Sequence, residues 1–492
     1  MYRPSFVAIA VVFGLILHNP ARGSETLEPS RATMPGKLSA SLNDQTVDLS
    51  LTDAVFLGLR DNRAISSAFL QRIAQKFDLR VAEDQFTPKL LLSGRYLMGH
   101  NQDNRYRNNA LSPNTTLLSE WGTRFSLSWT LINQTDRNGH YQSNGLTFSV
   151  IQPLLRDAGP EVTTAPVRLA RLGEQANRLS LKSTVSQTVT QIAVAYRELL
   201  RAQERLRIAC DALARSQQLM EVNKALIAAG RMAEFEIVQT EADAATQELG
   251  VEEAANQLDA GRRGLLQLLS VDLNTQVRAS DALEAKRVDL NAAQALRVAL
   301  ENQPDYLMQV ISSEQAAINL LVAKNQRLWD VSLVGGASQL RDRVLGDQSG
   351  NVNRQWDQYG GVQVNIPIGD LRPRQGEIRA EVDVRDKATR LTEMQQRLER
   401  DVGDAVRDVG TRWRQYEIAQ RARELSLRKL EIERDKLKVG RSSNFQVLSF
   451  ETDLRNAENA QLNALIAYLN AQTLLDEKLG MTLESWDIAL ND

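Results

Sequence analysis

The feature that most constrains this chain is a long heptad repeat in its first half. Apolar residues recur at every seventh position from Val185 through Ile192, Leu199, Leu206, Leu213, Met220 and Ile227. A strict seven-residue repeat predicts a long helix in a left-handed supercoil. Extended back to Gly159, this helix has about 70 residues and a length of roughly 100 Å. A compact domain cannot contain it, so we expect an elongated, mainly α-helical architecture.

The second half carries a similar seam, formed by Leu391, Met394, Leu398, Val402, Val409, Trp413 and Tyr416. Beside the first seam, Val189 and Tyr196 give way to the polar positions Gln203, Gln217 and Lys224. This pattern fits a helix that lines a water-filled lumen. An ordinary antiparallel coiled coil is the other interpretation of the two seams.

The two halves repeat one another. The segment Val47-Asp48-Leu49 aligns with Val288-Asp289-Leu290, and the register continues without a gap to Gly94 and Gly335. Further on, Gly230-Arg231 matches Gly440-Arg441. A tandem duplication is the simplest explanation, and each half has the order helix, strands, very long helix, Gly-Arg break, helix.

Several short segments alternate between apolar and polar residues, as membrane β-strands do. They centre on Leu90–Met98, Phe125–Leu131, Leu146–Val150, Val331–Ala337 and Val362–Ile366. Four tryptophans lie in or beside these segments, where a membrane-interface girdle would place them: Trp121, Trp129, Trp329 and Trp356. Sheet packing in a soluble domain is the alternative role for these tryptophans.

The number of membrane crossings in each half must be even, because the helices before and after the strands lie on the same side of the membrane. We expect crossings at 88–99 and 143–153 in the first half, with 121–132 as an extracellular extension, and at 330–339 and 359–368 in the second. Four strands cannot close a barrel, and an open sheet edge is not tolerated in lipid. Oligomerisation is therefore required.

The amino terminus predicts export. Arg3, the apolar core Ser5–Leu17 and Ala21-Arg22-Gly23 form a secretory signal. With 59 Lys and Arg against 61 Asp and Glu, the chain has no basic field for nucleic acid. One cysteine, three histidines and the lack of any nucleophile, phosphate-loop or zinc motif predict a non-enzyme, with no catalytic, cofactor-binding or metal-binding residues.

These features together resemble the TolC-like outer membrane efflux protein (outer membrane factor) family. The local segments Leu49-Ser50-Leu51-Thr52-Asp53-Ala54, Ile151-Gln152-Pro153-Leu154-Leu155 and Val439-Gly440-Arg441-Ser442-Ser443 are similar to the family's opening helix, strand exit and helix turn. The resemblance implies a mainly α fold with membrane β structure. It also implies a homotrimer in which four strands per subunit would form one 12-stranded barrel, continuous with a periplasmic α-helical coiled-coil tunnel.

On this basis we expect six segments, with a signal peptide at 1–23 and an N-terminal linker at 24–45. The first efflux-protein repeat occupies 46–270, an equatorial connector 271–287, the second repeat 288–480 and the C-terminal tail 481–492.

The resemblance also implies partners and a location. The protein is expected in the outer membrane of a Gram-negative-type bacterium, in contact with outer-membrane lipid, a periplasmic adaptor (membrane fusion protein) and an inner-membrane pump. Its expected function is passive export of small molecules or proteins, as the channel-tunnel of a tripartite efflux or type I secretion system. A periplasmic coiled-coil adaptor or scaffold is the alternative, although adaptors need only one helical hairpin and this chain has two.

The helix turns at the periplasmic tip are the expected functional sites. Gly230 and Gly440 should end the long helices there, and Ser442 or Ser443 should cap the next helix. The adaptor-docking residues would be Gly230, Arg231, Phe235, Gly440, Arg441 and Phe445; the alternative is that these are only solvated helix turns. Family members carry an acidic ring beyond the second glycine, but this chain has Gln446 and Ser449 at those positions. Acidic residues remain nearby as Glu234 and Glu236, so we expect Arg441 to pair with one of them across subunits and close the gate. An exposed ion pair with no gating role is the other possibility.

Overall fold

The computed structural model describes residues 46–100, 105–136, 139–289, 291–345 and 350–490. The expected signal peptide and N-terminal linker lie outside the described residues. Residues 46–492 form one unit by their internal contacts. Among the described helices, none is both long enough and apolar enough to cross a membrane.

Each half opens with two consecutive helices. In the first half these are α2 (Leu51–Asp61) and α3 (Arg63–Glu83), and in the second α7 (Ala292–Asn302) and α8 (Pro304–Gln326). A polar side chain caps the first helix of each pair. Ser50 forms a capping box with Asp53, and Asn291 accepts a hydrogen bond from the backbone N–H of Ala293. The matching lengths and caps follow from the duplicated sequence.

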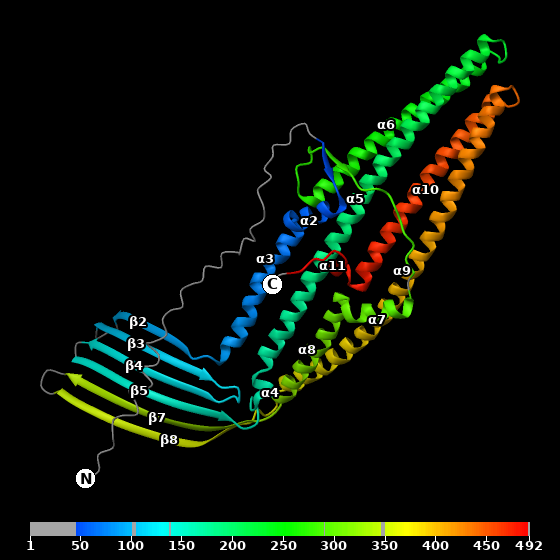
Figure 1. The fold of residues 1–492 in the computed structure, drawn as a ribbon. Helices are drawn as coiled ribbons and strands as arrows, with labels where there is room; N and C mark the ends of the chain where they lie inside the picture. Colours follow the sequence, from blue (N-terminus) through cyan, green and yellow to red (C-terminus); the bar gives the residue numbers. More distant parts are fainter. Residues whose placement is uncertain (1–45, 101–104, 137–138, 290, 346–349, 491–492) are drawn as a thin grey trace. The chain divides into compact units, whose positions relative to one another are not determined.

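Two very long helices dominate the chain (Figure 1). After the short α4 (Pro160–Thr163), α5 (Ala165–Ala228) has 64 residues, and α9 (Arg372–Lys438) has 67. Each is followed across a turn by an antiparallel helix, α6 (Glu236–Leu269) after α5 and α10 (Asn444–Leu479) after α9. At 1.5 Å per residue, α5 alone is about 96 Å long, as the heptad repeat predicts.

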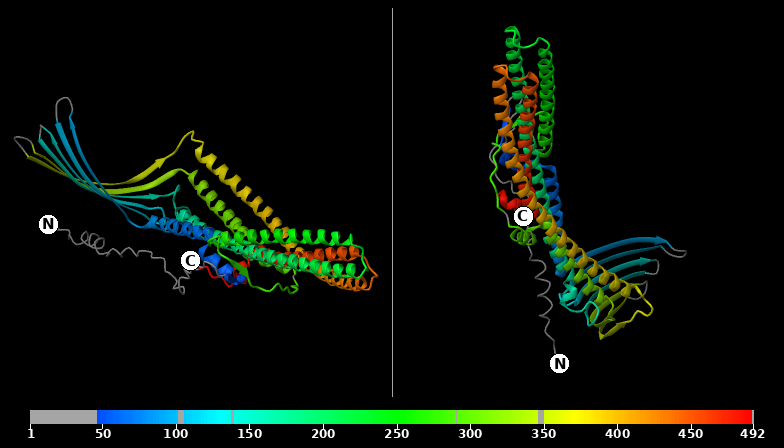
Figure 2. Two further views of the ribbon diagram at one scale, coloured as in Figure 1. Left: turned by 90° about the horizontal axis from the view of Figure 1, so that it is seen from above. Right: turned by 90° about the vertical axis from the view of Figure 1, so that its right-hand side faces the viewer.

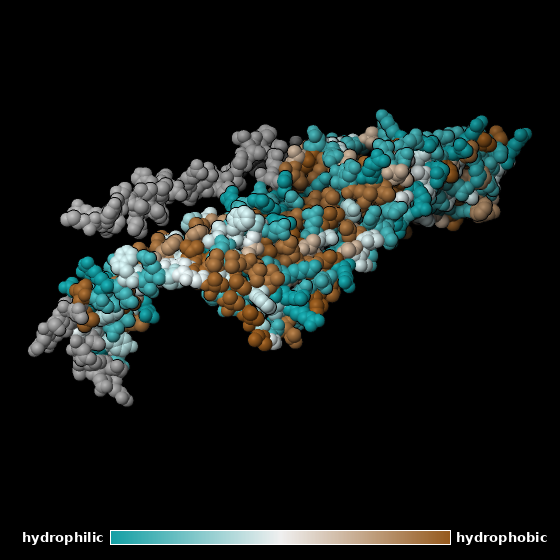
Figure 3. Space-filling model, turned by 90° about the horizontal axis from the view of Figure 1, so that it is seen from below, coloured by the Kyte–Doolittle hydropathy of each residue, from teal (hydrophilic) through white to brown (hydrophobic). Residues whose placement is uncertain are grey.

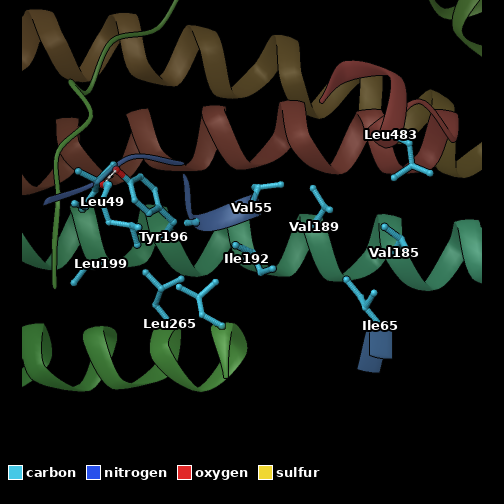
Figure 4. Packing of buried hydrophobic residues seen from close by; sticks show 14 of the residues in the cluster. Leu49, Val55, Ile65, Val185, Val189, Ile192, Tyr196, Leu199, Leu265 and Leu483 are labelled. Carbon is cyan, nitrogen blue, oxygen red and sulfur yellow. Dashed lines mark hydrogen bonds between the residues drawn. The ribbon is translucent and has the colours of Figure 1, made fainter. Parts of the chain in front are cut away.

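The first part of the heptad seam forms a hydrophobic core (Figure 4). Val185, Ile192 and Leu199 are fully buried there, and Tyr196 beside them donates a hydrogen bond from its hydroxyl to the carbonyl oxygen of Leu49 at 2.8 Å. Farther along α5, the seam residues from Leu206 onward are only half-buried in the single chain. A neighbouring stripe is buried instead, because Ile208 packs against Leu462 and Ile466 of α10.

A short parallel sheet supports this core. β1 (Val47–Leu49) pairs with β6 (Val277–Ala279). The backbone N–H of Leu51 also donates to the Asp281 carboxylate at 2.7 Å. The start of the first half is therefore fixed to the segment that joins the two halves. After α10 the chain ends with the short α11 (Thr482–Ser485).

The second sheet contains six antiparallel strands in the order β2-β3-β4-β5-β7-β8, curved as Figure 2 shows. The 3₁₀ helix η1 (Asp84–Phe86) leads into it. Its members are β2 (Lys89–His100), β3 (Arg105–Leu118), β4 (Arg124–Asp136), β5 (Gly139–Pro153), β7 (Asp330–Leu345) and β8 (Gly350–Asn365). The first half supplies four strands and the second half two, so the expected parity holds in each half.

The described residues form six strands in one sheet, two more per chain than the four expected to cross the membrane. Segment 121–132, expected as an extracellular extension, lies mostly in β4, one of the two central strands of this sheet. β3 was missed because its sequence does not alternate regularly and contains Pro113, which cannot donate a backbone hydrogen bond. The pairing of β3 with β4 indeed omits Ser112 and Pro113, while the rest of β3 continues in the same register.

Candidate functional site: the sheet faces and the helix tip

The six-stranded sheet has one predominantly apolar face near the helices. Directly paired residues of neighbouring strands lie on the same face, and the register places Phe148 in one row with Leu127 of β4 and Ala337 of β7. We call this side the apolar face. Its members include Leu90, Leu92, Tyr96, Met98, Leu111, Leu117, Phe125, Leu127, Trp129, Leu131, Leu146, Phe148, Val150, Val331, Leu333, Trp356, Val362 and Val364.

The opposite side, the polar face, carries mainly small hydroxyl and amide side chains. Ser126 and Ser149 share a hydrogen bond between their hydroxyl oxygens at 2.7 Å. Other members are Ser93, Arg95, Ser112, Asn114, Ser128, Thr130, Thr147, Ser332, Ser338, Gln355, Asp357 and Gln363. One side of the sheet is therefore mainly apolar and the other is the more polar, with Leu91, Leu97 and Tyr359 among its members.

Tryptophans lie at both ends of the apolar face. Trp129 and Trp356 lie in one cross-strand row, connected through Leu146 and Gln339. At the end near the helices, Trp329 is exposed and immediately precedes β7. About ten residues separate Trp329 from the row of Gln339, roughly 33 Å along the strand. At a strand tilt of 35–45° this is an apolar band about 25 Å tall, the height found in membrane barrels.

Beyond the Trp129–Trp356 row, the same face becomes charged. Arg341 lies directly opposite Arg354, and Arg343 follows one row farther out. All three side chains are exposed. In Figure 3, hydrophobic atoms gather where the sheet meets the helices, and hydrophilic atoms cover its far part. The apolar band is thus limited on its outer side by tryptophan and arginine.

At the other end of the long helices, both turns use the same glycine motif. Gly230 and Gly440 have φ of 66° and 74°, the left-handed conformation. The next residue in each turn, Arg231 or Arg441, donates its backbone N–H to a carbonyl five residues earlier at 2.8 Å. These are Schellman caps, which glycine accommodates without a Cβ penalty. Gly230 and Gly440 therefore end the long helices, as expected.

The two turns differ in how the next helix starts. Ser443 accepts a hydrogen bond from the backbone N–H of Gln446 and caps α10, as predicted for Ser442 or Ser443. Ser442 instead donates to Glu433 at 2.7 Å and, together with Lys436, lowers the pKa of that carboxyl. Phe235 occupies the N-cap position of α6 and makes no side-chain cap.

The expected docking residues are accessible at the tip. Phe235 and Phe445 are 77% and 65% exposed, which is unusual for phenylalanine. The Arg231 guanidinium lies 3.7 Å from the position a Cβ would take at Gly440, so the turns of the two halves are neighbours within one chain. The six expected docking residues thus lie together on two adjacent turns.

The expected gate residues lie on the same two turns and at the start of the helices that follow them, α6 and α10. Arg441 and Glu234 are exposed, whereas Glu236, Gln446 and Ser449 are half-buried. Within the described part of a single chain, Arg441 forms no ion pair with Glu234 or Glu236. Pairing across subunits stays a prediction.

A buried polar cluster just behind the tip was missed by sequence reasoning. Asn223 of α5 donates to Thr240 of α6 and to Asn444 of α10, both at 2.8 Å, and Asn444 donates to Thr240 at 3.0 Å. All three side chains are fully buried. The cluster joins the two hairpins. The available sequence signal was the presence of polar residues where helix-packing positions should be apolar.

A second polar bridge between the halves lies farther from the tip. Arg197 of α5 donates to the carbonyl oxygen of Leu469 at 2.8 Å and to the Thr473 hydroxyl at 2.7 Å, both on α10. Burial lowers the pKa of Arg197 to about 10 and raises the pKa of nearby Asp476. This contact had no signature in the sequence.

Among the described residues, no group of three or more His, Cys, Asp or Glu side chains is positioned to hold a metal ion.

Neither a protein-family model nor a curated protein matches the chain. Solved structures match it closely in fold. The Campylobacter jejuni CmeC outer membrane channel has a TM-score of 0.66 at 17% identity, over 88% of this chain and 86% of that one. For the outer membrane protein VceC from Vibrio cholerae the TM-score is 0.65 at 15% identity, over 87% of this chain and 96% of that one.

The Neisseria gonorrhoeae MtrE outer membrane channel, in its open state, gives a TM-score of 0.65 at 15% identity, over 88% of each chain. The fold of this chain is therefore that of the TolC-like outer membrane channels. The resemblance drawn from the sequence is confirmed at the level of the fold.

Proposed function

We propose that this protein is a subunit of a homotrimeric outer-membrane channel-tunnel that exports small molecules or proteins across the periplasm and the outer membrane. The observation that carries the proposal is the two-faced sheet, whose apolar band is about as tall as a bilayer's hydrocarbon region and is bounded by tryptophans. The fold shared with solved outer membrane channels supports the same function.

The sheet argues for assembly. Its outermost strands, β2 and β8, each pair on one side only within the chain. Six strands are fewer than the eight that just enclose packed side chains, and unpaired strand edges are not tolerated in lipid. Neighbouring copies must therefore complete the barrel. The number of three copies is taken from the resemblance to the TolC-like family.

In this assembly the polar face lines the lumen and the apolar face meets lipid. The long helices continue the conduit through the periplasm, which explains why the outer part of the α5 seam is only half-buried in one chain. The exposed Phe235 and Phe445 at the tip would contact a periplasmic adaptor bound to an inner-membrane pump. In a scaffold that stays in the periplasm, the apolar face would be exposed to water, which is unfavourable.

Membrane fractionation tests the proposal directly. We expect the protein in the outer-membrane fraction as a heat-modifiable trimer, and single-channel conductance when the purified trimer is added to planar bilayers. Cross-linking from a photoreactive residue at position 231 or 441 should capture an adaptor in cells. A soluble periplasmic monomer without conductance would refute the proposal.

A further inference from the structure

The first half of the chain contains a hairpin that the second half lacks. β2 and β7 follow equivalent helices, α3 and α8, and β5 and β8 each lead to a long helix. In the second half the two strands are consecutive, whereas in the first half β3 and β4 lie between them in the chain and in the sheet. The inserted hairpin, residues 105–136, is the principal departure from the duplication.

The hairpin is an integral part of the sheet. All 12 residues of β2 pair with β3, and all 13 residues of β4 pair with β5. β2 and β5 do not pair with each other, so the sheet cannot lose the hairpin without losing its continuity.

The side chains of β4 repeat the apolar pattern of the strands around the hairpin, and those of β3 do so in part, at Leu111 and Leu117. Leu127 of β4 lies in the row of Phe148, and Trp129 lies in the row of Trp356. On β3, Leu117 lies opposite Phe125 on the same face. A hairpin that projects into water would gain nothing from an apolar face in register with a lipid-facing band. Both inserted strands therefore belong to the membrane segment.

The direction of the edge strands permits closure with further copies. All five neighbouring pairs are antiparallel, so β2 and β8, at opposite edges of six strands, run in opposite directions. The β8 edge of one copy can then join the β2 edge of the next as another antiparallel pair. This contact is the same at every subunit boundary, as a closed ring requires.

We propose that three copies close an eighteen-stranded barrel, in place of the expected twelve strands, with the inserted hairpin crossing the membrane in every subunit. The inference rests on the proposed trimeric channel and adds the width of its membrane pore. With strands 4.8 Å apart and tilted by about 40°, eighteen strands give a backbone diameter of about 36 Å, against about 24 Å for twelve.

This width fits the helical part that adjoins the sheet. Four helices per chain lie side by side there, in the order α3, α5, α8, α9. Twelve helices at 8–10 Å spacing have a perimeter of about 110 Å, close to the roughly 113 Å of eighteen tilted strands. The barrel therefore continues the tunnel without narrowing.

Counting strands by electron cryomicroscopy of the purified trimer is the primary test. A trimer with eighteen strands supports the inference. A trimer with twelve strands, and residues 105–136 outside the barrel, overturns it and leaves the channel function standing. A protein that is not a trimeric membrane channel would refute the proposed function itself.

Cysteine labelling in intact outer membranes gives an independent test in a Cys210→Ser background. The Leu127→Cys and Ser128→Cys variants place a thiol on the apolar and polar faces of β4. We expect a membrane-impermeant maleimide to label Ser128→Cys through the lumen and to fail at Leu127→Cys until the membrane is dissolved and the protein denatured. Equal labelling of both variants in intact membranes would place the hairpin in water and contradict the inference.

Discussion

At the scale of single residues, the glycines at the tip act through backbone conformation alone. A Cβ added at Gly440 would meet no backbone atom, but φ of 74° is unfavourable for any residue with a side chain. Gly403, inside α9, has open space around it and ordinary helical φ. Replacing each of these two glycines with alanine is therefore expected to change the stability in opposite directions.

We predict that Gly440→Ala destabilises the α9–α10 hairpin by about 1–2 kcal/mol, because alanine is strained in the left-handed region. Gly403→Ala should stabilise the helix by about 0.5–1 kcal/mol, since alanine has less backbone entropy to lose. Thermal unfolding followed by circular dichroism measures both. Equal shifts in the same direction would show that φ at position 440 does not control the turn.

An ion pair between α3 and α5 gives a prediction that depends on pH. Arg72 binds Glu174 with two hydrogen bonds, and the side chains are only 5% and 18% exposed. The hydrogen bonds from Arg72 lower the pKa of Glu174 below its usual 4.5. This stabilisation is present above pH 4.5 and is lost as the pH falls through the lowered pKa of the folded state.

We predict that Glu174→Gln lowers the stability at pH 7 by about 1.5–3 kcal/mol, because the mostly buried contact loses its charge-assisted hydrogen bonds. The variant should also lose less stability than the wild type as the pH falls below 4.5. Unfolding midpoints measured from pH 7 to pH 3 test both points. Glu83→Gln is the control, since the exposed pair of Glu83 with Arg171 joins the same two helices and is worth at most about 1 kcal/mol. If the stability of wild type and of Glu174→Gln fell in parallel with pH, the assignment of this pH dependence to Glu174 would be contradicted.

At the scale of elements, the sheet has an apolar and a polar face because side chains alternate between its two sides along each strand. The register brings Phe148 and Val364, from two of the alternating segments found in the sequence, to one face. A one-residue slip between strands would turn part of the apolar face to the other side. The face, rather than any individual residue, is thus the functional unit of the sheet.

We predict that Phe148→Arg destabilises the membrane-inserted trimer by about 2–4 kcal/mol, the usual cost of arginine near the bilayer midplane on the lipid face. Thr147→Arg, one residue away on the polar face, should leave the trimer intact. Heat-modifiability on gels and the yield of outer-membrane protein measure the difference. Equal tolerance of both substitutions would refute the assignment of the apolar face to lipid.

At the scale of the whole molecule, the tip is where several copies would converge. Arg441 is exposed, and within the described part of one chain it forms no ion pair with Glu234 or Glu236. Its guanidinium is accessible to an acidic residue of a neighbouring copy. Packing of Phe235 and Phe445 is the alternative means of closing the tip.

We predict that Arg441→Glu raises single-channel conductance in planar bilayers, because like charges then repel where a pair held the tip closed. Adding Glu236→Arg should restore opposite charges and lower the conductance again. Unchanged conductance in Arg441→Glu would instead assign the constriction to the two phenylalanines.

The sequence alone determined the local features of this protein. The heptad spacing of Val185, Ile192 and Leu199 predicted the long helix, and Gly440 and Ser443 predicted where one helix ends and the next begins. These features depend on residues close together in the chain, through helix periodicity and backbone conformation.

Only the tertiary structure decided which distant segments meet. β3 is a strand because β2 and β4 satisfy its backbone hydrogen bonds, although Pro113 interrupts its own pattern. Asn223, Thr240 and Asn444 form a buried cluster because two hairpins bring them together from three helices. A polar residue at a packing position is costly unless it finds a partner, and that partner is chosen by long-range packing, which local periodicity does not encode.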